Sequence, residues 1–83
     1  MQTDFKPNWK ALEKKIGDRC QEFMYMGRVG GINLYKHILT RRYLNLDDLG
    51  NCYIYRNSRY ELTHFELQMA LIKAGRKMIS RTI

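Results

Sequence analysis

The clearest indication of how this chain folds lies in residues Tyr43-Leu44-Asn45-Leu46-Asp47-Asp48-Leu49-Gly50-Asn51-Cys52-Tyr53-Ile54-Tyr55-Arg56. Two runs that alternate apolar and polar residues flank a turn rich in Asp, Gly and Asn, and this pattern predicts a β-hairpin. With a three-residue loop at 48–50, whose final glycine takes the left-handed conformation, Leu46 lies opposite Cys52 and Asn45 opposite Tyr53. A slip of one residue would mix the two faces, so the pattern itself favours this register.

This register sorts the side chains of the hairpin by type. One face holds Leu44, Leu46, Cys52 and Ile54. The other face holds Tyr43, Asn45, Tyr53 and Tyr55. We expect helices to cover the apolar face and the tyrosine face to remain open to solvent.

Composition indicates one small folded domain. The chain has 83 residues, is 45% hydrophobic and contains one proline, which is typical of a folded rather than a disordered chain. No apolar run approaches the roughly 20 residues needed to cross a bilayer, and the N-terminus lacks the features of a signal peptide. We therefore expect a cytoplasmic protein without membrane contact. Cys20, Cys52, His37 and His64 lack the spacing of metal ligands, so we expect no metal and no other cofactor.

The net charge of +7 is spread along the chain, with a modest excess near the C-terminus. Such a balance favours polyanionic partners, either nucleic acid or an acidic protein surface.

The first predicted helix spans residues 8–25. Asn8 is placed as its N-cap, and apolar residues at steps of three and four form one stripe. That stripe comprises Trp9, Leu12, Ile16, Cys20 and Phe23. The glycine-rich residues 27–31 then predict a loop, and residues 32–37 predict a strand with Ile32 and Leu34 on its covered side. A helix over residues 33–42 is the competing interpretation.

The second predicted helix begins at Thr63, which stands three residues before Glu66 as a capping box. This helix carries two apolar stripes on nearly opposite sides. One of them comprises Leu67, Leu71, Ala74 and Met78. Either the helix is sunk between the sheet and the first helix, or this stripe is the seam of a homodimer.

These elements predict an α+β fold with two layers in the order α-β-β-β-α. Both helices cover one face of a three-stranded antiparallel meander. The single domain, residues 1–83, comprises an N-terminal arm (1–7), a folded core (8–76) and a basic C-terminal tail (77–83).

The uncovered face of this sheet is the predicted binding site. Tyrosines interleaved with arginines can stack on bases and neutralise phosphates, and they are also typical anchors of protein interfaces. The candidate binding residues are Tyr35, His37, Arg41, Arg42, Tyr43, Tyr53, Tyr55, Arg56 and Arg59. We expect a non-catalytic nucleic-acid-binding protein, with RNA ahead of DNA. The alternative is a small inhibitor or accessory subunit that docks on another protein in a bacterial or phage system.

Catalysis finds little support in the sequence. His37 lies near Arg41 and Arg42, a set that could cleave RNA by general acid–base chemistry and phosphate stabilisation. The only two carboxylates that stand next to each other in the sequence are Asp47 and Asp48, and the predicted turn explains this pair. We expect no enzyme, with a small ribonuclease as the less favoured alternative.

The helix–three strands–helix order is similar to that of double-stranded-RNA-binding domains and of the HicA-type toxin ribonucleases. The first resemblance implies a lysine cluster at the start of the last helix, where this chain has Thr63-His64-Phe65-Glu66-Leu67. The second rests on residues 30–37, GGINLYKH, and on Ala74-Gly75 near the chain end. It implies a catalytic histidine at the position of Ile32. Both resemblances concern architecture over about residues 8–76, and architecture alone does not confer function.

Overall fold

The structure is a computed structural model that describes the backbone of residues 6–81 and the side chains of residues 6–74. Within these residues the chain forms helix α1 (Lys10–Ile16), the 3-10 helix η1 (Gly17–Glu22), five strands and helix α2 (Phe65–Arg81). The strands are β1 (Phe23–Val29), β2 (Ile32–His37), β3 (Tyr43–Asp47), β4 (Cys52–Arg56) and β5 (Arg59–Thr63). They form one antiparallel sheet in the order β1-β2-β3-β4-β5.

The predicted α+β class is confirmed, whereas the predicted three-stranded meander is wrong because the sheet has an additional strand at each edge. Residues 33–42 are not helical, since β2 ends at His37 and an irregular loop leads to β3. Residues 77–81, expected in a basic tail, continue α2. Residues 1–5 and 82–83 of the predicted arm and tail lie outside the described residues.

Strand β1 begins inside the segment predicted as the end of the first helix. Gly17 has φ +59°, a left-handed value that glycine adopts at little cost, and α1 ends there. The tighter η1 then continues to Glu22. The apolar stripe survives this change, because Leu12 and Phe23 are in the core and Trp9, Ile16 and Cys20 pack against it.

The glycines predicted to form a loop instead form the turn of a hairpin. Val29 pairs with Ile32, so Gly30 and Gly31 are the two turn residues between β1 and β2. Their φ angles of +53° and +82° match a type I′ turn, which requires positive φ at both positions.

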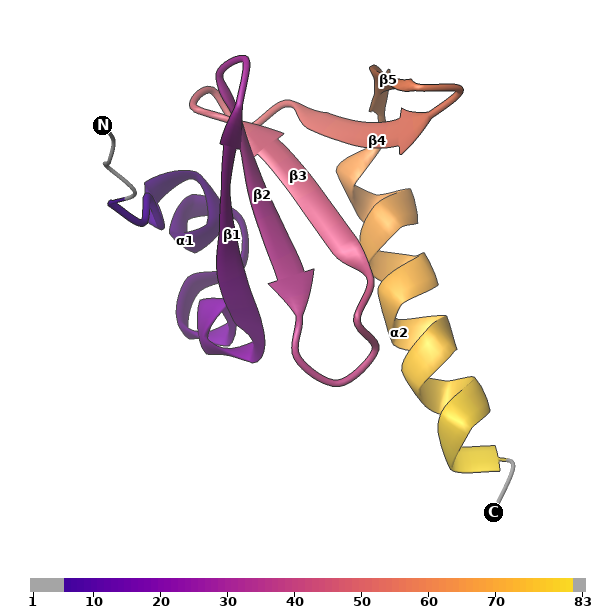
Figure 1. Cartoon of the computed structure of the whole chain (residues 1–83). Coiled ribbons are helices and arrows are strands. Elements are labelled where there is room, and N and C mark those ends of the chain that lie inside the picture. The colour runs from indigo at the N-terminus through magenta and orange to yellow at the C-terminus, as the bar shows by residue number, and fades with distance from the viewer. Residues whose placement is uncertain (1–5, 82–83) are drawn as a thin grey trace.

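The hairpin of β3 and β4 keeps the predicted register over a short length. Asn45 pairs with Tyr53 and Leu46 with Cys52, and Gly50 has φ +90°. Strand β4 pairs with β5 over its whole length, and beyond these two pairs it leaves β3. Arg56 and Arg59 flank the turn between β4 and β5. The β4–β5 hairpin therefore projects away from the other three strands, and α2 runs alongside β3 below it (Figure 1).

Both helices contribute to the core on one face of the sheet, as predicted, but α2 also reaches around the edge of β3 to the other face. Helix α1 packs on the face of the sheet that carries Leu44 and Leu46, and all described core residues belong to one cluster. Helix α2 lies along the free edge of β3 (Figure 1). Its Met69 and Ile72 enter the core, while its Gln68 and Leu71 line a groove on the opposite face.

Strand β2 faces the other way from the prediction. Tyr35 pairs with Leu44 and Asn33 with Leu46, and paired residues of neighbouring strands project from the same face. Tyr35 and Asn33 are therefore fully buried against α1, whereas Leu34 is only half-buried. The polar atoms of both buried residues are satisfied. The Tyr35 hydroxyl donates to the Asn8 carbonyl oxygen at 2.6 Å, and the Asn33 amide donates to the Leu46 carbonyl oxygen at 3.2 Å.

The start of α2 differs slightly from the prediction. Thr63 ends β5 and the helix begins at Phe65, so the segment joins strand to helix without an intervening loop. Neither α2 nor any other helix of the described part of the chain is long and apolar enough to cross a membrane.

Candidate functional site

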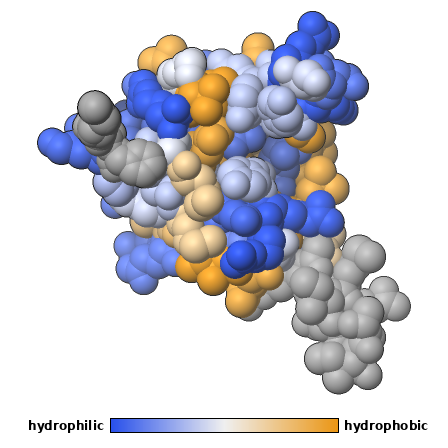
Figure 2. All heavy atoms as spheres, viewed as in Figure 1, coloured by the Kyte–Doolittle hydropathy of each residue, from blue (hydrophilic) through white to orange (hydrophobic). Residues whose placement is uncertain are grey.

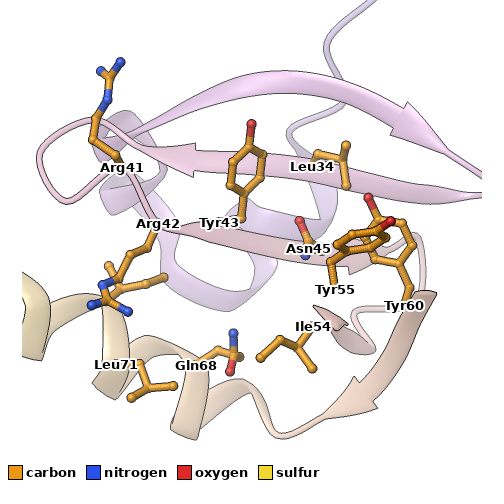
Figure 3. Close-up of a pocket in the computed structure, with 11 residues that line it drawn as sticks. Leu34, Arg41, Arg42, Tyr43, Asn45, Ile54, Tyr55, Tyr60, Gln68 and Leu71 are labelled. Carbon is orange, nitrogen blue, oxygen red and sulfur yellow. The ribbon is translucent and has the colours of Figure 1, made fainter. Parts of the chain in front are cut away.

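The face of β2 and β3 opposite α1 carries a groove of about 500 Å³, here called the tyrosine groove. Its volume falls in the range of roughly 300–1,000 Å³ that is usual for ligand sites. It is bounded by the sheet, the splayed β4–β5 hairpin and one side of α2 (Figure 3). The lining residues are Leu34, Arg41, Arg42, Tyr43, Asn45, Ile54, Tyr55, Tyr60, Gln68, Leu71 and Ile72.

Three tyrosines supply the aromatic surface of the groove. Tyr43 projects from β3 and is 41% exposed, and Tyr55 projects from β4 and is 59% exposed. Tyr60 pairs with Tyr55 across the β4–β5 hairpin, and their ring centroids are 4.8 Å apart. In Figure 3, Tyr43 stands on one side of Asn45, and Tyr55 and Tyr60 stand on the other. The rings are thus positioned to stack on flat ligands.

Arg41 and Arg42 bring positive charge to one end of the groove. Both lie in the loop between β2 and β3 and are exposed. Arg42 extends toward α2, and Arg41 points away from the groove floor (Figure 3). Within the described side chains, neither arginine forms an ion pair with a carboxylate, unlike Arg19, Arg28, Arg56 and Arg59. Their charges are therefore available to an anionic ligand.

The buried His37 holds this arginine loop in place. Its Nδ1 accepts hydrogen bonds from the backbone N–H groups of Leu39 and Thr40, at 3.3 and 3.2 Å. Because Nδ1 accepts, a neutral ring carries its proton on Nε2, which lies 3.1 Å from Glu22 Oε1. This hydrogen bond is the main reason why the pKa of Glu22 is lowered.

For two of the predicted site residues the prediction is wrong, because they do not lie on the groove face. Tyr35 and His37, which are 0% and 3% exposed, lie on the covered face and cannot contact a ligand in the groove. The physical reason is the pairing of β2 with β3, which turns Tyr35 toward Leu44.

Arg56 and Arg59 are exposed, and both form ion pairs with the same carboxylate. Both donate to the Glu61 carboxylate, at 3.0 and 3.1 Å. The hydrogen bond from Arg56, followed by that from Arg59, lowers the pKa of Glu61. Tyr53 is on the groove face but does not line the groove. Its hydroxyl donates to Asp47 Oδ2 at 2.9 Å, and this bond raises the pKa of Tyr53.

The structure thus brings Arg41, Arg42, Tyr43 and Tyr55 together as predicted and adds residues that sequence reasoning missed. Tyr60 could have been found, since a two-residue turn at 57–58 places it opposite Tyr55. Gln68 and Leu71 could not have been found from the sequence, because they line the groove only as a result of where α2 packs against the sheet.

Asn45 is the least expected member of the site. It is 3% exposed, and its Nδ2 donates to the Tyr53 carbonyl oxygen at 3.2 Å. Its Oδ1 is buried and has no hydrogen-bond partner among the described residues. Buried acceptors without a donor are rare in folded proteins.

The groove offers a ligand tyrosine rings, two guanidinium groups and two side-chain amides. On the face shown in Figure 2, hydrophilic and hydrophobic surface lie side by side. In the part of the chain that the structure describes, no three His, Cys, Asp or Glu side chains converge on a point where a metal ion could sit. Burial raises the pKa of the Cys52 thiol to about 11, which disfavours a reactive thiolate.

Comparison of the chain with models of protein families, with curated proteins and with solved structures finds no significant match.

Proposed function

We propose that this protein is a non-catalytic nucleic-acid-binding protein that holds single-stranded RNA in the tyrosine groove, with single-stranded DNA as a weaker ligand. One observation carries the proposal. Two arginines without ion pairs among the described residues adjoin three tyrosine rings in one groove of about 500 Å³. This combination of free positive charge and open aromatic surface suits a strand whose bases are unstacked.

The two kinds of side chain make different contributions. Stacking of a base on an aromatic ring is worth about 1–3 kcal/mol per base and tolerates any sequence. Arg41 and Arg42 neutralise phosphates and release counterions, so their contribution falls as the salt concentration rises. The net charge of +7 adds long-range attraction to the polyanion.

The proposal is tested by fluorescence anisotropy with a labelled single-stranded RNA over a range of salt concentrations. We expect the double variant R41A/R42A to bind more weakly, with a salt slope smaller by about one for each arginine that neutralises a phosphate. The variant K10A/K14A is the matched control, because it also removes two exposed positive charges but from α1, away from the groove.

Three outcomes are informative. A larger loss of affinity in R41A/R42A than in K10A/K14A supports the groove as the binding site. Equal losses would assign the binding to net charge alone. No binding of the unaltered protein at low salt would overturn the proposal.

A second candidate function, docking on another protein, is favoured by the exposed leucines of α2. Leu67 is 57% and Leu71 is 50% exposed, and both belong to the stripe proposed as a homodimer seam. Ala74 is also exposed, whereas the side chain of Met78 lies outside the described residues. Light scattering of the nuclease-treated protein, with L67K as the variant that breaks such a seam, separates a dimer from a monomer.

The ribonuclease alternative required an accessible His37. Because that ring is buried and serves the arginine loop, we do not propose it as a catalytic group.

A further inference from the structure

We infer that Asn45 reads one nucleobase in the tyrosine groove. Its Oδ1 accepts a hydrogen bond from the exocyclic amine of that base, so the groove binds adenine, cytosine and guanine, which carry such an amine, in preference to uracil. This inference rests on the proposed function, since it assigns a base preference to the same groove.

The orientation of the Asn45 amide follows from its one bonded neighbour. The Tyr53 carbonyl oxygen can only accept, so the amide nitrogen of Asn45 must face it, at 3.2 Å. Asn45 Oδ1 is then the atom left without a donor among the described residues. The side chain therefore presents an acceptor and no free donor on that side.

The surroundings of this acceptor define what can reach it. Asn45 lies between Tyr43 and the pair Tyr55–Tyr60 in the view of Figure 3, and all four residues line the groove. Gln68 of α2 lines the same groove and is 8% exposed, yet it makes no hydrogen bond to Asn45 Oδ1. No described side chain supplies a donor for this oxygen, so we assign that role to a molecule that enters the groove.

The depth of the acceptor gives the preference among bases. Asn45 is 3% exposed and its Oδ1 has almost no exposed surface, so a donor reaches it only if it projects from the ligand and the Asn45 side chain turns toward the groove. The amines of adenine and cytosine project beyond the ring edge. The N3–H of uracil lies between two carbonyl oxygens. When this N–H approaches Asn45 Oδ1, the two carbonyl oxygens approach as well, and they repel the Asn45 oxygen. An acceptor that is left unpaired in the wrong complex is a strong source of discrimination.

The test compares three labelled RNAs of equal length by fluorescence anisotropy: oligouridine, and the same strand with a single central adenine or a single central cytosine. We expect the two strands with an amine to bind about 3- to 10-fold more tightly, as one hydrogen bond provides. The variant Asn45→Leu keeps the number and branching of the side-chain heavy atoms and removes the amide, including the acceptor, so it should bind all three strands alike.

A change in the ligand tests the same contact without altering the protein. Purine in place of the central adenine keeps the ring and lacks the amine, and its strand should bind like oligouridine. Equal binding of all strands by the unaltered protein, or a preference that persists in Asn45→Leu, would overturn the inference while the proposed function stands. Absence of binding to every strand at low salt would overturn both.

Discussion

The hydroxyl of Tyr35 links the N-terminal segment to the middle of the sheet. Its ring lies 5.7 Å from the rings of both Trp9 and Tyr25, in a cluster at the edge of the core. Burial raises the pKa of Tyr35, so the phenol remains protonated and donates to the Asn8 carbonyl oxygen at 2.6 Å. A tyrosine can therefore replace an aliphatic residue in this core, because its polar tip finds a backbone acceptor.

Replacement of Tyr35 by phenylalanine tests this contact. We expect Y35F to lower the free energy of unfolding by about 1 kcal/mol, the usual net value of one hydrogen bond. Y43F is the matched control, because Tyr43 is 41% exposed and its change should stay within about 0.5 kcal/mol. Urea denaturation of both variants measures the difference. Equal stabilities would show that the Tyr35 hydroxyl contributes nothing.

At the scale of elements, the β1–β2 turn sets the position of the edge strand. Gly30 and Gly31 have positive φ angles, and a Cβ atom added at either position would meet no atom within 4 Å. Any cost of substitution therefore comes from the backbone conformation alone and not from crowding.

Two substitutions in this turn should differ in effect. G31A should destabilise the protein by about 1–2 kcal/mol, because alanine is strained at φ +82°. G30N should be nearly neutral, since asparagine tolerates the left-handed conformation and Asn-Gly is the preferred type I′ pair. Thermal denaturation of the two variants checks the order. A G31A variant as stable as the unaltered protein would contradict the type I′ assignment.

At the scale of the whole molecule, hydrogen-bonded carboxylates make the free energy of unfolding depend on pH. Four of them in the described part of the chain have a lowered pKa, and in Asp47 burial opposes the shift while hydrogen bonds with Asn51, Tyr53 and Leu49 outweigh it. The pKa values of Glu22, Asp48 and Glu61 are all lowered from their ordinary values of 4.5, 3.8 and 4.5. The main causes are hydrogen bonds from His37, Arg28 and Arg56, respectively. In the unfolded chain these carboxylates take up protons at higher pH than in the folded protein. Their stabilisation is therefore present above about pH 4.5 and is lost as the pH falls through the lowered values.

A melting-temperature profile between neutral and strongly acidic pH checks this expectation. We expect a nearly constant melting temperature above about pH 5 and a progressive fall below it. In D48N the fall should be smaller and the melting temperature at neutral pH lower, because the contact with Arg28 at 2.8 Å is weakened. E13Q, which removes an exposed carboxylate without an ion pair among the described residues, should leave the profile unchanged.

Local sequence pattern was sufficient to assign most side chains of the β3–β4 hairpin and of the first helix to a face, although Ile54, expected on the covered face, lines the groove with Tyr55. Alternation around the loop 48–50 predicted the pairs Asn45–Tyr53 and Leu46–Cys52, and it placed Tyr43 and Tyr55 together on the face opposite Leu44. The apolar stripe from Trp9 to Phe23 was likewise correct in its members, although the α-helix ends at Ile16. These features follow from side-chain periodicity, which is local.

Long-range packing, by contrast, sets which way β2 faces, where β4 leaves β3, and that α2 lies along the edge of β3. Each depends on contacts between segments far apart in the chain, such as Tyr35 with Leu44 and the entry of Ile72 into the core. The alternation of β2 fits either orientation, because Tyr35 can be buried once the Asn8 carbonyl oxygen accepts a hydrogen bond from its hydroxyl. The tyrosine groove exists for the same reason, since its walls come from strands, loop and helix that meet only in the folded chain.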